Sequence, residues 1–140
     1  MRLHVAVLTA MTLMAGPAAA QASRPDFAPV QCKAFGAKLK SCTPYTCVYP
    51  YPFNNAPVSK QIIGPSSGGC ATIEQTSDGG IHIACRYTPA TQAAVANYLV
   101  AVEAAIAANK KIEVKGDKTF INGVSIGNPA QDAVTRGECQ

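Results

Sequence analysis

Six cysteines are the residues of this sequence with the clearest chemical meaning. They are Cys32, Cys42, Cys47, Cys70, Cys85 and Cys139. A cysteine can be a nucleophile, a metal ligand or half of a disulfide. An even number in a short exported chain favours disulfides, because the space outside the cytosol is oxidising. We therefore expect structural disulfides, with no metal and no cofactor.

Cys42 and Cys47 form the one motif that suggests catalysis. Thiol-disulfide oxidoreductases use two cysteines, separated by two residues, at the start of a helix whose N-terminus lowers the thiol pKa. Here four residues separate the cysteines, and further prolines follow at positions 50 and 52. The spacing favours structural disulfides, and an oxidoreductase using Cys42 and Cys47 is the alternative.

The spacing of the histidines and carboxylates does not indicate a catalytic site. His4 lies in a segment expected to be removed on export, which leaves His82 in the middle of a predicted strand. A general base would need a nucleophile and an orienting acid at its side, and the spacing selects neither. We assign no catalytic residue and expect a non-catalytic protein, with an enzyme as the alternative.

Aromatic and proline residues gather between residues 45 and 53. A rigid, extended segment with aromatic rings suits recognition of a partner. The favoured interpretation is that these rings fill the core of a small domain that has no tryptophan. The candidate interaction surface comprises Tyr45, Tyr49, Tyr51 and Phe53, together with His82 and Arg86 from a later strand.

The N-terminus has the three parts of a secretory signal peptide. Arg2 precedes an apolar run over residues 5–14, and Ala18-Ala19-Ala20 supplies the small residues of a cleavage site. We expect residues 1–20 to be a signal peptide cleaved near Ala20 and residues 21–31 to be a flexible leader. The apolar run is shorter than the ~20 residues of a membrane span. The sequence therefore predicts a periplasmic or secreted protein with no membrane span in the mature chain.

Three strands followed by a long helix are predicted in the middle of the chain. Residues 80–87 alternate apolar and polar, the pattern of a half-buried antiparallel strand. Thr88 and Pro89 fit the N-cap and first position of a helix that runs to about Lys110. The expected order is a short helix at 32–42, strands at 58–64, 70–76 and 80–87, the long helix, a hairpin at 112–124 and a helix at 129–136.

Composition and order together predict a single α+β domain over residues 32–140. We expect a three-stranded antiparallel meander extended by a C-terminal hairpin, covered by one long helix and stapled by disulfides. A net charge of +4, with charged residues at 14%, does not supply the concentrated basic face of a nucleic-acid-binding protein. A content of 48% hydrophobic residues argues against disorder.

The hairpin at 70–87 predicts a disulfide between Cys70 and Cys85. A turn closing at Ser77-Asp78 places them opposite each other, whereas a wider turn over residues 77–80 places Cys85 opposite Thr72. Only the tighter register brings the two Cα atoms within disulfide reach. In a helix over 32–42, Cys32 and Cys42 lie ~15 Å apart. Cys42–Cys47 and Cys32–Cys139 are then the simplest remaining pairs.

Several short motifs resemble a set of small exported bacterial proteins of unknown function. The motifs are Cys42-Thr43-Pro44-Tyr45-Thr46-Cys47, Pro52-Phe53, Ile63-Gly64, Gly69-Cys70, Gly79-Gly80, Cys85-Arg86-Tyr87, Asn128-Pro129-Ala130-Gln131-Asp132-Ala133 and Gly137-Glu138-Cys139. The resemblance covers most of the mature chain. It implies export, a cysteine frame and a core of strands and a helix, and it carries no catalytic residue.

These observations predict a binding or accessory module of the cell envelope. Its partner is expected to be an envelope or extracellular protein, and not a nucleic acid. A secreted inhibitor or effector is a further alternative, because small disulfide-bonded domains suit that role.

Overall fold

The computed structural model describes residues 32–50, 55–78 and 80–140. The predicted signal peptide, the leader, Tyr51 and Phe53 lie outside the described residues. The elements are α2 (Phe35–Lys40), β1 (Tyr45–Pro50), β2 (Pro57–Ser66), β3 (Gly69–Thr76), β4 (Ile81–Tyr87), α3 (Pro89–Ala107), β5 (Ile112–Lys115), β6 (Lys118–Ile121), β7 (Val124–Gly127) and α4 (Pro129–Thr135).

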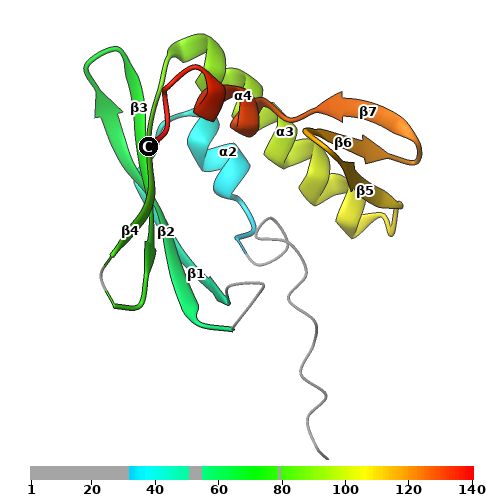
Figure 1. Cartoon of the computed structure of the whole chain (residues 1–140), viewed down its shortest axis with the longest axis horizontal. Coiled ribbons are helices and arrows are strands. Elements are labelled where there is room, and N and C mark those ends of the chain that lie inside the picture. Colours follow the sequence, from blue (N-terminus) through cyan, green and yellow to red (C-terminus); the bar gives the residue numbers. More distant parts are fainter. Residues whose placement is uncertain (1–31, 51–54, 79) are drawn as a thin grey trace, which may run out of the picture.

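The α+β class is confirmed, with two antiparallel sheets in the described part of the chain. The larger sheet has the strand order β1-β2-β3-β4, and the smaller one has the order β5-β6-β7. The sequence predicts that the C-terminal hairpin extends the first sheet. In the structure this hairpin instead forms a sheet of its own at the far end of α3 (Figure 1). The hydroxyls of Tyr98 on α3 and Thr119 on β6 are 2.9 Å apart and join the two parts.

Strand β1 comes from the segment rich in proline and tyrosine. It pairs with β2 along its whole length and forms one edge of the larger sheet. An edge is where proline is tolerated in a sheet, because a residue there can lack an N–H on its outer side. Tyr49 is buried, whereas its neighbour Val48 is 63% exposed on the opposite face.

Neither strand β1 nor strand β7 is among the elements predicted from the sequence. Strand β7 follows Asn122 and Gly123, which have φ values of 49° and 81°. Asn-Gly with both residues in the left-handed region is the usual two-residue turn of a β-hairpin. The predicted hairpin thus continues into a third short strand that pairs with β6.

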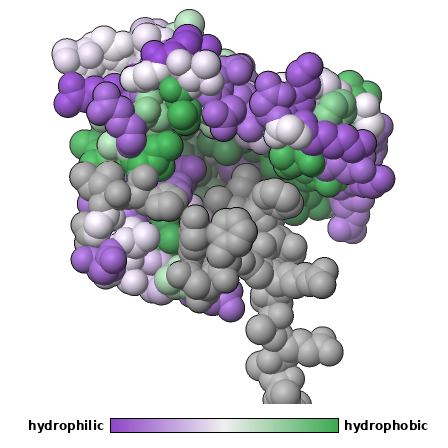
Figure 2. All heavy atoms as spheres, viewed as in Figure 1, coloured by the Kyte–Doolittle hydropathy of each residue, from purple (hydrophilic) through white to green (hydrophobic). Residues whose placement is uncertain are grey.

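The short helix α2 lies against the larger sheet, and α3 packs mainly on α2 (Figure 1). Helix α3 also contacts β3 and β4, so the long helix covers the sheet together with α2. Leu39 and Phe35 anchor α2 in the core, because both side chains are fully or almost fully buried there. Figure 2 shows apolar side chains between the sheet and the helices and hydrophilic ones at the margins.

Helix α3 begins as predicted, with Pro89 in the first turn and the Thr88 side chain accepting a hydrogen bond from the Thr91 N–H. It ends at Ala107 and not near Lys110. Among the described helices, α3 is long and apolar enough to cross a membrane by length and composition alone. Val95 and Val102 are buried against the rest of the molecule, whereas 28% of the apolar stretch as a whole is buried.

All six cysteines form disulfides, but each predicted pairing was wrong. The bonds are Cys32–Cys47, Cys42–Cys70 and Cys85–Cys139. Cys70 does not bond Cys85, Cys42 does not bond Cys47, and Cys32 does not bond Cys139.

The register of the β3–β4 hairpin explains the first error. The turn after Thr76 is closed by the Thr76 N–H, which donates to the Gly80 carbonyl. Cys85 therefore lies opposite Thr72, and Cys70 lies opposite Tyr87. This is the wider of the two registers that the sequence allowed, so the register chosen on the basis of a Cys70–Cys85 bond was wrong.

The C-terminal segment explains why Cys85 bonds Cys139. After α4 the chain runs along β4, where Ala84 and Gln140 exchange two backbone hydrogen bonds of 2.8 and 2.9 Å. Cys139 then faces Cys85 directly in an antiparallel bridge. The same pairing covers the β4 edge of the sheet.

Candidate functional site

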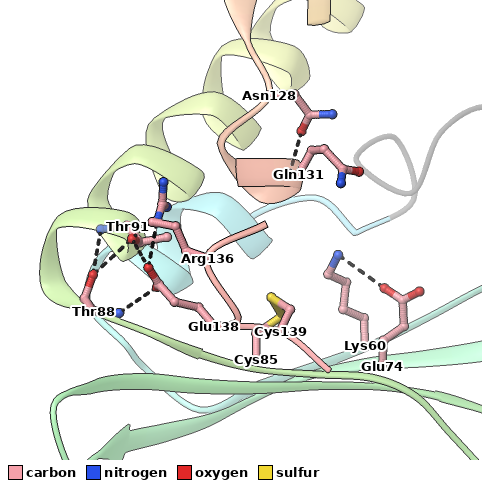
Figure 3. Close-up of a disulfide and its surroundings, with 10 residues drawn as sticks. All are labelled: Lys60, Glu74, Cys85, Thr88, Thr91, Asn128, Gln131, Arg136, Glu138 and Cys139. Carbon is pink, nitrogen blue, oxygen red and sulfur yellow. Dashed lines mark hydrogen bonds and ion pairs between the residues drawn. A yellow bond between two sulfur atoms is a disulfide. The ribbon is translucent and has the colours of Figure 1, made fainter. Parts of the chain in front are cut away.

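A cavity of about 340 Å³ lies between the core-side face of the larger sheet and helix α4. Strands β2, β3 and β4 supply one wall, and α4 with the residue before it supplies the other (Figure 3). Its lining includes Lys60, Thr72, Glu74, Ile83, Tyr87, Asn128, Ala130, Gln131, Val134 and the Cys85–Cys139 disulfide. Cavities that bind small ligands combine an apolar lining with a few polar groups in this way.

Lys60 and Glu74 form an ion pair on the sheet wall. They are direct partners on β2 and β3, and Lys60 Nζ lies 3.4 Å from a Glu74 carboxylate oxygen. Alternation along β2 explains why Lys60 faces inward, since Val58 and Ile62 on either side of it are buried. The Lys60 and Glu74 side chains are 26% and 14% exposed. The charged pair is therefore largely withdrawn from solvent.

The lysine also contacts the core, since its Nζ lies 5.2 Å from the centre of the Phe35 ring. A cation over an aromatic face is stabilised by the ring quadrupole. This contact holds the ammonium end of Lys60 on the core side of the sheet.

Tyr87 adds a neutral hydroxyl to the sheet wall. Burial raises the pKa of Tyr87, a hydrogen bond with Thr72 partly opposes this shift, and the charges of Glu74 and Glu138 add to it. The phenol is therefore protonated throughout the physiological pH range.

Helix α4 presents two side-chain amides to the cavity. Asn128 caps the helix by accepting a hydrogen bond from the Gln131 N–H at 3.3 Å. The side-chain amide of Gln131 has no hydrogen-bond partner among the described residues, and it points into the space above Lys60 in Figure 3. Ala130 and Val134 provide the apolar part of this wall.

Glu138 fixes the chain between α4 and the sheet. Its carboxylate accepts hydrogen bonds from the Thr88 N–H at 3.0 Å, the Thr91 hydroxyl at 2.8 Å and Arg136 Nε at 3.0 Å (Figure 3). Desolvation opposes ionisation, but these hydrogen bonds and the charge of Arg136 outweigh it and lower the pKa of Glu138. With the Cys85–Cys139 disulfide beside it, this network positions α4 over the cavity.

The residues predicted as an interaction surface are not brought together. Tyr49 is buried, and Tyr45 packs edge-on against Phe35 with 6.2 Å between ring centres. The burial of Tyr49 agrees with the favoured interpretation that these rings fill the core, and Tyr45 is partly buried at the margin of that core. Arg86 is exposed on the opposite side of the sheet. The side chain of His82 falls outside the described part of the structure.

The other face of the larger sheet is the second candidate region. A hollow of about 770 Å³ lies there against the C-terminal segment, with Ile63, Ile73, Ala84 and Arg86 in its lining. No described helix covers this face (Figure 1). Ile63 is 50% exposed.

The cysteine chemistry of the molecule is structural. Cys42 and Cys47 belong to two different disulfides, so they are not a dithiol pair, and the oxidoreductase alternative based on them was wrong. Six cysteines in three disulfides are typical of an oxidising compartment outside the cytosol. Among the described residues, no three His, Cys, Asp or Glu side chains are grouped as metal ligands.

Sequence reasoning missed the residues that form the cavity. Lys60 and Glu74 carry no motif, and their only signal is a charge at an inward position of each predicted strand. No known protein family, curated protein or solved structure matches this chain. The geometry of the cavity is therefore the basis for a functional conclusion.

Proposed function

We propose that this protein is a non-catalytic binding module of the periplasm or the extracellular space, and that the cavity beneath α4 is where it holds a small ligand. The three disulfides and the signal-like N-terminus support a location outside the cytosol.

The observation that carries the proposal is the convergence of polar groups in a cavity with a fixed frame. Lys60, Glu74 and Gln131 reach the cavity from two different layers of the fold. The Cys85–Cys139 bond ties the segment after α4 to the sheet. A preorganised cavity binds with a smaller loss of conformational entropy than a flexible one.

The same groups favour binding over turnover. Lys60 and Glu74 are already paired with each other across the sheet wall, so the charge of each is engaged by the other. Cys85 and Cys139 are bonded, so neither offers a thiolate. Each polar group is thus suited to hold a ligand in place.

Native mass spectrometry of the exported protein tests the proposal. The full chain is produced with its own N-terminus, recovered after export, and exposed to a small-molecule extract of the cell envelope. Val134 lines the cavity and is 41% exposed, so Val134→Trp narrows the cavity from its rim. Val124→Trp on β7 is the matched control, because Val124 is 67% exposed and lies in the other sheet.

We expect a small-molecule adduct on the wild type and on Val124→Trp, and none on Val134→Trp. An adduct that persists on folded Val134→Trp contradicts the proposal, and so does the absence of any adduct on the wild type. Near-UV circular dichroism of both variants shows whether the fold is kept.

A protein partner on the open face of the larger sheet is the second candidate function. The uncovered hollow and the exposed Ile63 favour it. An envelope protein recovered by the wild type, and lost with Ile63→Glu, would support an accessory subunit. Recovery by both forms contradicts this candidate. Fractionation of the producing culture separates a periplasmic subunit from an inhibitor or effector released into the medium.

A further inference from the structure

We infer that the cavity is built for a small zwitterion of the α-amino acid class, with the ligand carboxylate at Lys60 and the ligand ammonium at Glu74. This inference rests on the proposed function and specifies the ligand of the same cavity. It follows from the charge balance of the wall, the donors that face it and the size of the space.

The charge balance excludes a singly charged ligand as the best fit. Lys60 and Glu74 form a neutral pair on one wall. An anion would satisfy Lys60 and leave Glu74 without a counter-charge, and a cation would do the reverse. An uncompensated charge in a partly desolvated site is costly. A zwitterion gives each of the two residues a partner of opposite charge.

The contact between the two residues leaves room for such an exchange. Their separation of 3.4 Å exceeds the ~2.7–2.9 Å of a tight charge-assisted hydrogen bond. Both side chains extend from their strands toward the α4 side of the cavity in Figure 3. The carboxylate and ammonium of an amino acid are held at a fixed short distance, so they can approach two neighbouring opposite charges at once.

The opposite wall supplies what the rest of an amino acid needs. The side-chain amide of Gln131 can donate to the ligand carboxylate, and the amide of Asn128 lies beside it. Ala130 and Val134 on this wall, with Ile83 on the sheet wall, form an apolar lining for an aliphatic side chain. About 340 Å³ is at the small end of ligand cavities, which favours a single amino acid over a peptide.

Calorimetric titration with charge-deleted analogues tests the inference on the wild-type protein. The zwitterionic probes are the aliphatic amino acids leucine, isoleucine and valine. Each is compared with the acid that lacks its amino group and the amine that lacks its carboxylate. We expect at least one amino acid to bind about tenfold or more tightly than both of its analogues, the difference expected when one charged hydrogen bond is lost.

Variants of Lys60 and Glu74 test whether these residues bind the two charged groups of the ligand. Lys60→Met and Glu74→Gln should each weaken binding of that amino acid by about tenfold or more. The double change Lys111→Met/Glu113→Gln is the matched control, because it removes an ion pair of 3.1 Å on the smaller sheet, away from the cavity. This control should leave the affinity unchanged.

The titrations can overturn the inference in two ways. One is an absence of binding by all three amino acids, and the other is an analogue with a single charge that binds as tightly as its parent. If Val134→Trp abolishes an adduct that is not a zwitterion, the inference fails while the proposed function stands. If no adduct is sensitive to Val134→Trp, the proposed function fails as well.

Discussion

Lys60 and Glu74 place two charges on the face of the sheet that otherwise carries the core. A small domain gains little stability from such a pair, because desolvation of the two groups offsets their attraction. Replacing a withdrawn ion pair by apolar residues of similar size is often neutral or stabilising. A pair retained under these conditions is readily explained by a role in recognition.

This explanation predicts a separation of stability from binding. In the variant Lys60→Met/Glu74→Leu, we expect a free energy of unfolding within about 1 kcal/mol of the wild type, or above it, and a loss of ligand binding. Urea denaturation measures the first quantity and calorimetric titration the second. A double variant that still binds the ligand would show that the pair serves packing alone.

Glu138 has a pH signature that follows from its hydrogen bonds. Its pKa is lowered in the folded protein, so its contribution to stability is present above the ordinary pKa of 4.5 and is lost as the pH falls through the lower folded value. We expect Glu138→Gln to lower the free energy of unfolding by about 1–2 kcal/mol at pH 7. The difference from the wild type should shrink below pH 4.5.

Urea denaturation between pH 3 and pH 7 checks this prediction. Asp117→Asn is the control, since Asp117 is exposed at the β5–β6 turn. A difference between wild type and Glu138→Gln that stays constant down to pH 3 would show that the carboxylate charge has no part in the network.

Gly69 marks the closest approach of two backbone segments. A Cβ on this residue would overlap the Tyr87 carbonyl oxygen, so Gly69→Ala must displace β3 from β4. We expect a loss of more than about 3 kcal/mol. Gly68→Ala is the matched control, because Gly68 has a φ of 88° and open space around it, so only backbone strain of ~1–2 kcal/mol applies. Equal losses in the two variants, measured by thermal denaturation, would contradict the β3–β4 geometry.

At the scale of elements, the disulfides link segments that local structure alone would leave loosely joined. Cys32–Cys47 spans 15 residues and Cys85–Cys139 spans 54. In the chain-entropy model the longer loop contributes about 4 kcal/mol and the shorter about 3 kcal/mol. The Cys85–Cys139 bond also holds α4 over the cavity, so its removal should affect function as well as stability.

We therefore expect the double variant Cys85→Ala/Cys139→Ala to lose more stability than Cys32→Ala/Cys47→Ala. Only the first of them should lose ligand binding at a temperature where both are folded. Chemical denaturation and titration of the two variants check this order. Peptide mapping without reduction checks the pairing itself, and a peptide joining Cys70 to Cys85 would contradict it.

The elements that sequence reasoning predicted correctly are those with local signals. Strand β4 alternates with a period of two, and α3 and α4 begin with a capping residue followed by proline. Such patterns depend on residues within one turn or one strand, so they can be recognised without the rest of the chain.

The parts that could not be predicted depend on contacts between distant segments. The predicted Cys70–Cys85 disulfide was wrong because the turn after Thr76 is two residues longer than the predicted one. The longer turn places Thr72, and not Cys70, opposite Cys85. Strand β1 was missed because its prolines obscure a strand that is held by pairing with β2. The cavity depends on the Cys85–Cys139 bond and on the backbone pairing beside it, because these tie the segment after α4 to β4.

At the scale of the whole molecule, one sheet face is covered by helices and the other is open. The cavity lies on the covered side, at the end where α4 replaces α2 as the covering element (Figure 1). This arrangement offers a small ligand a preorganised space and leaves the outer face free for a second contact. We expect ligand binding to occur in the cavity and not on the open face.

Nitrogen–proton correlation spectra of the ¹⁵N-labelled protein distinguish binding in the cavity from binding on the open face. The side-chain amides of Asn128 and Gln131 report on the cavity, and those of Asn97 and Asn109, which are exposed elsewhere, serve as references. On addition of a small-molecule extract of the cell envelope, we predict that the Asn128 and Gln131 amide signals shift while the reference signals do not. Signals that shift only around Arg86 on the open face, or an unchanged spectrum, would contradict the account.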